Sequence, residues 1–96
     1  MTDPATAPRS IVDEIRDRLV ASLSPTALDV TNDSAQHAGH MGDDGTGETH
    51  FGVTVESAAF IGQSRVQRQR LVNHALADLL RDHIHALAIR ARAPGE

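Results

Sequence analysis

One stretch decides the fold: Glu48-Thr49-His50-Phe51-Gly52-Val53-Thr54-Val55-Glu56. Apolar side chains alternate there with polar ones, so that Phe51, Val53 and Val55 share one side of an extended chain. Successive side chains of a strand point to opposite faces of a sheet, so this alternation predicts a strand that is buried on one face. The other face of this predicted strand carries His50 and Thr54.

Helical patterns lie on both sides of this strand. Apolar residues recur every three or four positions in residues 11–23 and again in residues 65–82, which predicts two amphipathic helices. Ser10 and Ser64 stand directly before them, and serine in that position caps the first turn of a helix. Pro25 follows the first of these segments and ends it.

Two further strands complete the predicted order. Residues 27–31 alternate between apolar and polar side chains, and residues 84–91 form a short apolar run. The first two strands can pair antiparallel, whereas a strand that follows a helical crossover favours parallel pairing with its predecessor. The order α-β-β-α-β therefore predicts an α+β fold: a three-stranded mixed sheet with the helices on one face.

Length and hydropathy favour one small soluble domain. The chain has 96 residues, of which we expect residues 1–9 to form a flexible N-terminal arm and residues 10–94 a single domain. No apolar run approaches the roughly 20 residues that a membrane span needs, and no secretory signal is visible at the N-terminus. We expect a cytoplasmic protein that has no membrane contact and is a monomer when alone.

Composition excludes several classes of function. The chain contains no Cys and no Lys, which rules out disulfides, thiolate nucleophiles and iron–sulfur clusters held by its own thiolates. A net charge of −4 is not typical of a nucleic-acid binder, although residues 60–81 carry four Arg and one Asp, a local charge of +3. Phosphate-binding loops with Lys, GxSxG elbows and HExxH helices are all missing, so we predict a protein that is not an enzyme.

Six His residues are the unusual feature of the composition, because His is the commonest metal ligand. In the predicted topology His37 follows the first strand, His50 begins the second and His85 begins the third, so all three meet at one edge of the sheet. His40 lies three residues after His37 in a polar loop. These residues are candidate ligands, but a solvated loop and a strand-edge His bonded to a carbonyl explain the same pattern.

A second candidate surface begins the second predicted helix. Gly62 and Ser64 form the turn, and Arg65 and Arg68 share a helix face from which Arg70 points away. Arginines after a glycine-containing turn can contact phosphate. A solvated helix face is the alternative explanation of the same residues.

Four motifs in this order resemble the BolA family over residues 10–94. They are His37-Ala38-Gly39-His40, Gly47-Glu48-Thr49-His50-Phe51, Phe60-x-Gly62-x-Ser64-x-x-x-Arg68-x-Arg70 and Ile84-His85-Ala86-Leu87-Ala88-Ile89. The resemblance implies an α-β-β-α-β fold of the class II KH type. The chain departs from the family at Gln69, where many members have His between the two arginines.

The resemblance also implies an iron–sulfur role. BolA-like proteins associate with monothiol glutaredoxins and share a [2Fe–2S] cluster, in which the ligands from this chain would be His85 and the loop residue His37. His50 and His40 are the reserves. A partner cysteine and glutathione would complete the site, so that this chain holds no cluster alone. Such an adaptor would serve iron homeostasis or cluster trafficking, and its imidazoles could ligate only when they are unprotonated.

An alternative function follows from the same family. Bacterial members are linked to transcription, stress response and cell morphology, with the KH-like turn and helix as the proposed DNA contact. Here that surface comprises Gly62, Ser64, Arg65, Arg68 and Arg70. The GxxG loop of KH domains is absent, since only its first glycine, Gly62, is present.

Overall fold

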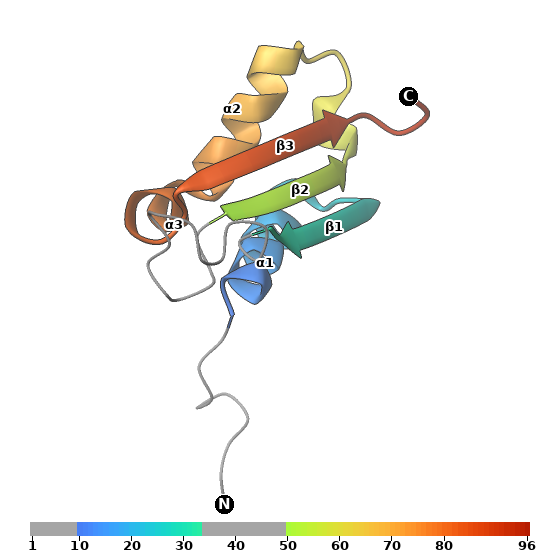
Figure 1. Cartoon of the computed structure of the whole chain (residues 1–96). Coiled ribbons are helices and arrows are strands. Elements are labelled where there is room, and N and C mark those ends of the chain that lie inside the picture. The colour runs from blue at the N-terminus through green and yellow to red at the C-terminus, as the bar shows by residue number, and fades with distance from the viewer. Residues whose placement is uncertain (1–9, 34–49) are drawn as a thin grey trace, which may run out of the picture.

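A three-stranded sheet lies at the centre of the computed structural model, which describes residues 10–33 and 50–96 (Figure 1). Its strands are β1 (Ala27–Asn32), β2 (His50–Glu56) and β3 (Ala86–Arg92), in the spatial order β1-β2-β3. β2 pairs antiparallel with β1 and parallel with β3. The predicted mixed sheet and its pairing are confirmed.

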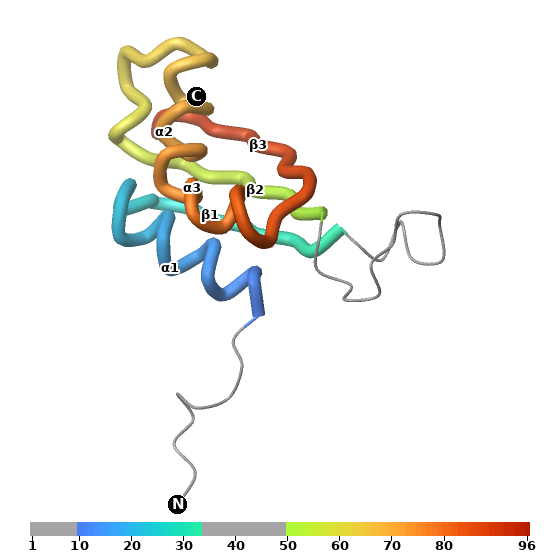
Figure 2. Tube along the Cα trace, turned by 90° about the vertical axis from the view of Figure 1, so that its left-hand side faces the viewer, coloured from blue at the N-terminus to red at the C-terminus, as the bar shows by residue number. Residues whose placement is uncertain are grey.

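The helices pack against one face of this sheet and leave the other face open (Figures 1 and 2). They are α1 (Ile11–Leu23), the short 3₁₀ helix η3 (Ala58–Phe60), α2 (Arg65–Ala75) and α3 (Ala77–Asp82). The Ser10 hydroxyl accepts the amide hydrogen of Asp13, and Ser64 forms a capping box with Gln67. Both serines therefore act as the predicted caps, since each satisfies an amide at a helix start.

The prediction of one helix over residues 65–82 is wrong, because the segment divides at Leu76 into α2 and α3. Leu76 departs from helical geometry, with φ −108° and ψ 14°. Val72, Leu76 and Leu79 are all buried in the same core. The bend lets both helices turn their apolar sides toward that core, a tertiary effect that no Pro or Gly marks in the sequence.

The strand ends also differ slightly from the predictions. β1 includes Asn32, and β3 runs from Ala86 to Arg92, so that Ile84, which is buried, precedes the strand. The expected arm over residues 1–9 lies outside the described residues. The same holds for residues 34–49, which contain most of the predicted polar loop.

The core fills the space between the helices and the sheet. Phe51, Val53 and Val55 are buried as the alternation predicts, whereas Thr54 between them is exposed. Buried apolar side chains from the helices complete this core: Ile15, Leu19, Leu23, Phe60, Val72, Leu76 and Leu79. No helix in the described part of the chain is long and apolar enough to span a membrane.

Candidate functional site

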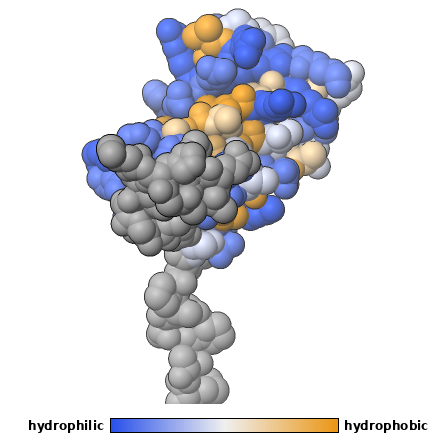
Figure 3. Space-filling view, in the orientation of Figure 1, coloured by the Kyte–Doolittle hydropathy of each residue, from blue (hydrophilic) through white to orange (hydrophobic). Residues whose placement is uncertain are grey.

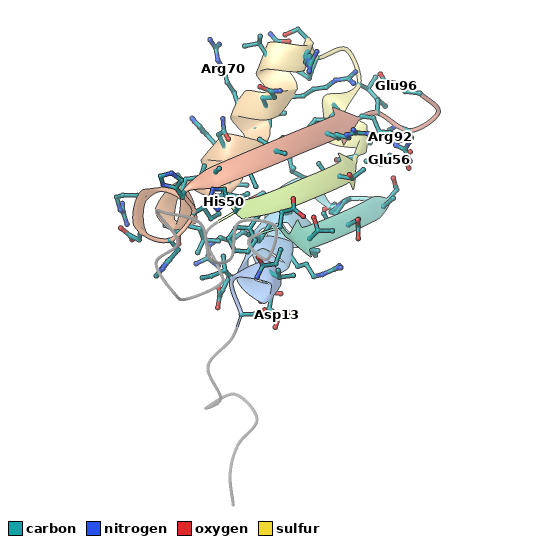
Figure 4. The ribbon with its side chains drawn as sticks, in the orientation of Figure 1. Asp13, His50, Glu56, Arg70, Arg92 and Glu96 are labelled. Atoms are coloured by element: carbon teal, nitrogen blue, oxygen red, sulfur yellow. The ribbon has the colours of Figure 1, made fainter. Side chains whose placement is uncertain are left out.

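Two histidines meet at the edge of the sheet where β2 and β3 both begin. His50 is the first residue of β2 and pairs with Ala86, the first residue of β3, so His85 directly precedes the paired position. The two imidazole centroids are 5.4 Å apart, and the ring planes are tilted by 58°. His85 is exposed and His50 is half-buried, so this part of the predicted convergence is present (Figure 4 labels His50).

The segment that carries the other two candidate ligands begins and ends at this edge. Asp33 follows β1, and its amide donates a hydrogen bond of 2.8 Å to the carbonyl of His50. The chain between them, with His37 and His40, lies outside the described residues. The hydrogen bond therefore holds Asp33 and His50, the two residues that flank this segment, beside each other at this edge of the sheet.

The separation of the two imidazole rings is compatible with both rings binding one metal ion. A tetrahedral ion bound by two imidazole nitrogens at about 2.0–2.1 Å holds the ring centroids about 5 Å apart, which is close to the observed separation. Within the described ranges, however, no three His, Cys, Asp or Glu side chains group closely enough to form a metal site. The described residues therefore offer these two imidazoles as candidate ligands.

Gly52 makes a close approach at this edge that the sequence pattern does not predict. A Cβ atom on Gly52 would lie 2.8 Å from Oγ1 of Thr31 and 3.0 Å from Oδ2 of Asp33. The missing side chain therefore leaves room beside β2 for the side chains of Thr31 and Asp33. Glycine weakens a strand and is found inside one where a neighbouring group needs the space. Gly52 within the predicted strand is therefore the sequence feature that could have indicated this close approach.

The remaining described histidines lie outside this pair. His74 is near the end of α2, and His83 follows α3. Both side chains are exposed. Both are therefore solvated surface residues apart from the His50–His85 pair.

The second candidate surface, at the start of α2, is only partly available. Arg65 and Arg70 are exposed, and Arg70 projects from the outer side of α2 (Figure 4). Gly62 has φ 77°, which favours glycine, and Ser64 is engaged in the cap. These four residues stand where the prediction places them.

Arg68 is committed to a contact within the chain. Its two terminal nitrogens each lie 2.6 Å from an oxygen of Glu96, and its Nε donates to the Gln63 carbonyl at 2.9 Å. The Glu96 carboxylate raises the pKa of the Arg68 guanidinium. Arg68 in turn lowers the pKa of Glu96 to about 2, with help from the Ala93 amide. No local pattern in the sequence links Arg68 to a residue beyond β3, so this pair is not predicted from the sequence.

Known proteins resemble this chain in sequence. The family model described as BolA-like protein matches residues 19–96. An uncharacterized protein in the cobS 5' region of Sinorhizobium sp is 46% identical over 91% of this chain and 95% of its own length. The "DNA-binding transcriptional regulator BolA" of Vibrio cholerae is 47% identical over 82% of this chain and 71% of its own length.

Some relatives are longer than this chain. BolA-like protein 1 of Homo sapiens is 48% identical over 85% of this chain, but the match spans 57% of the human protein. SufE-like protein 1 of Arabidopsis thaliana is 46% identical, and the match spans 23% of its length. That plant protein is named as chloroplastic and mitochondrial, so a cytoplasmic location for this chain stays a prediction.

Solved structures share the fold. BolA1 from Arabidopsis thaliana superposes with a TM-score of 0.80 at 37% identity and covers 93% of this chain and 98% of its own. The BolA domain of SufE1 from the same plant gives 0.79 at 43% identity, with 92% and 96% covered. Family match, sequence identity and fold agree: this chain belongs to the BolA-like protein family.

Proposed function

We propose that this protein is a non-enzymatic adaptor that binds a monothiol glutaredoxin and completes a shared [2Fe–2S] site. One observation carries the proposal: the exposed imidazole of His85 lies beside His50, at the edge where residues 34–49 begin and end. The edge offers nitrogen donors on a surface that a second protein can reach. This arrangement suits ligation across an interface.

The donor set fits half of such a site. A [2Fe–2S] cluster takes four ligands, which are usually thiolates, and imidazoles replace two of them in Rieske-type centres. His85 would supply one nitrogen and His37 the second, with His50 or His40 as substitutes. Because this chain has no Cys, a partner cysteine and glutathione would supply the sulfur ligands. A cluster held there supplies one-electron redox chemistry.

The residues of this chain would position the imidazole ligands, and the protonation state of each imidazole would decide whether it can bind. The parallel pairing of β2 with β3 brings His85 to the edge where His50 lies, and a hydrogen bond joins Asp33 and His50, which flank the residues that contain His37. Each imidazole can ligate only in its neutral form. The proposed role therefore depends on position and protonation rather than on acid–base catalysis.

The test combines the protein, a monothiol glutaredoxin, glutathione, iron and sulfide without oxygen. Visible absorption and circular dichroism are recorded against glutaredoxin alone. We expect a new spectrum that His85→Ala abolishes and that His74→Ala, a matched control on an exposed helical position, leaves unchanged. A spectrum identical to that of glutaredoxin alone, or equal in the wild type and His85→Ala, would contradict the proposal.

A DNA-binding regulator is the second candidate, favoured by the surface at the start of α2. Arg65 and Arg70 are exposed there, and Ile61 and Val66 are more than half exposed beside them. The Vibrio cholerae relative is named as a DNA-binding regulator. Arg68 contributes less to this candidate, because Glu96 already occupies its guanidinium.

Salt titration of DNA binding tests this second candidate. Each arginine that contacts phosphate adds close to one unit to the slope of log affinity against log salt concentration. Arg65→Ala and Arg70→Ala should each lower that slope, whereas Arg16→Ala on α1 should not. Failure to shift duplex DNA at low salt would exclude this function.

A further inference from the structure

An open cavity of about 570 Å³ lies between α2 and the edge of the sheet formed by β3. Among the described strands β3 pairs only with β2, and α2 runs beside its other edge (Figure 2). The wall combines four arginines, two glutamines, a threonine and two apolar residues: Arg65, Arg68, Arg90, Arg92, Gln63, Gln69, Thr54, Ile89 and Ala91. The arginines of β3 lie toward the end of the strand away from His85, roughly 20 Å along it.

The lining of this cavity offers hydrogen-bond donors and positive charge. Every polar side chain in it is a donor, and no carboxylate belongs to the wall. Arg92 is paired with Glu56 at 3.3 Å on the open face of the sheet (Figure 4). Arg65 and Arg90 form no ion pair with any residue in 10–33 or 50–96, so two positive charges remain uncompensated.

One arginine in the cavity is already held in position. The Arg68 side chain is 15% exposed, and its Nε is fixed by the Gln63 carbonyl. Its outer nitrogens bind both oxygens of Glu96 in the two-pronged geometry that guanidinium also forms with phosphate. The Glu96 carboxylate therefore occupies a place that one phosphate could take.

We propose that this cavity binds a nucleoside triphosphate. Adjacent phosphoryl groups would lie between Arg65 and Arg90 and reach Arg68 by displacing Glu96. Ile89 and Ala91 give the nucleoside an apolar surface, and the volume lies within the range of small-ligand sites, about 300–1,000 Å³. The net charge of −4 is not typical of a nucleic-acid binder, which favours a single nucleotide as the occupant.

Calorimetric titration of the full chain with ATP tests the proposal, with inorganic triphosphate, adenosine and a short single-stranded oligonucleotide as comparison ligands. We expect Arg65→Ala and Arg90→Ala each to weaken ATP binding about tenfold, the effect of losing a charged hydrogen bond. Arg16→Ala removes the same charge from α1, outside the cavity, and should leave the affinity unchanged. Glu96→Gln should tighten binding several-fold because the competing carboxylate loses its charge.

The outcomes separate the proposal from its rivals. If triphosphate and adenosine each bind more weakly than ATP, the cavity is a nucleotide site and the proposal is supported. If triphosphate binds as tightly as ATP, the cavity is a simple anion site and the proposal is overturned. Tighter binding of the oligonucleotide than of ATP, lost in Arg90→Ala, shows a nucleic-acid groove and also overturns it. The proposal is also overturned if Arg16→Ala weakens ATP binding as much as Arg65→Ala or Arg90→Ala does, or if no binding is detected at millimolar ATP. Because the titration needs neither iron nor glutaredoxin, its result is independent of the proposed cluster site.

Discussion

The imidazole rings of His50 and His85 lie 5.4 Å apart, although α2 and α3 separate the two residues along the chain. The parallel pairing of β2 with β3 produces this proximity, because His50 stands opposite Ala86. The relationship therefore depends on the crossover connection of the sheet. It also raises a question about ligand identity, because the structure brings His50 to His85, whereas the proposed second ligand, His37, lies outside the described residues.

Single substitutions identify the second ligand of the proposed cluster. We expect His37→Ala to alter the visible circular dichroism of the glutaredoxin complex as strongly as His85→Ala does. His50→Ala should give a smaller change, since it removes only a neighbour of His85. A larger spectral change for His50→Ala than for His37→Ala would make His50 the second ligand and exclude His37 from that role. His74→Ala again serves as the control.

A side chain at position Gly52 is predicted to lower the free energy of unfolding. Alanine in a strand is intrinsically favoured over glycine by about 0.5–1 kcal/mol, but turning the Thr31 and Asp33 side chains away from their preferred rotamers costs about 0.5–1.5 kcal/mol each. The new Cβ of Gly52→Ala would meet Thr31 and Asp33 at 3.0 Å or less. We expect a net destabilisation of about 1 kcal/mol, measured by urea denaturation.

A double substitution checks the cause of that loss. Thr31→Ala removes the Oγ1 atom that lies nearest to the added Cβ. In the Thr31→Ala background, Gly52→Ala should therefore cost less than it does in the wild type, with a coupling of about 0.5–1 kcal/mol. Strict additivity of the two substitutions would show that the contact does not cause the loss.

Local patterns predicted the fold well, but contacts between distant segments escaped them. Alternation in residues 48–56 correctly identified the buried side of β2, and the serine caps correctly marked two helix starts. The break at Leu76 and the Arg68–Glu96 pair depend instead on how α2 packs against the core and β3. Periodicity and capping act within a few residues, so they carry no information about such partners.

Ser57 is predicted to be the most costly serine to replace. It is fully buried, and its hydroxyl donates to the Leu23 carbonyl at 2.6 Å and accepts from the Ala59 amide at 3.1 Å. Ser57→Ala leaves a buried carbonyl without this donor, which should lower the free energy of unfolding by about 1–3 kcal/mol. Ser22→Ala, at an exposed position of α1, should change it by less than about 0.5 kcal/mol. Equal effects in thermal or urea unfolding would contradict the role of this hydrogen bond.

Acid titration provides a direct measure of the Arg68–Glu96 pair. Carbon NMR should find the pKa of the Glu96 carboxyl near 2, well below its ordinary value of 4.5, because Arg68 binds the charged form. Arg68→Met should raise this pKa most of the way back, since only the Ala93 amide then remains as a donor.

The same pair makes stability depend on pH in a defined direction. A carboxyl whose pKa is lower in the folded state stabilises the fold above its unfolded pKa and loses that contribution as the pH falls toward its folded pKa. Wild-type stability should therefore drop more steeply than that of Arg68→Met between about pH 4.5 and pH 2. The difference should be small, because Glu96 is nearly half exposed, and it should shrink further in high salt. Parallel acid unfolding curves, together with an unchanged Glu96 pKa in the variant, would show that the pair does not persist in solution. Glu96 could then not shield Arg68 in the cavity beside β3, and Glu96→Gln would leave nucleotide affinity unaltered.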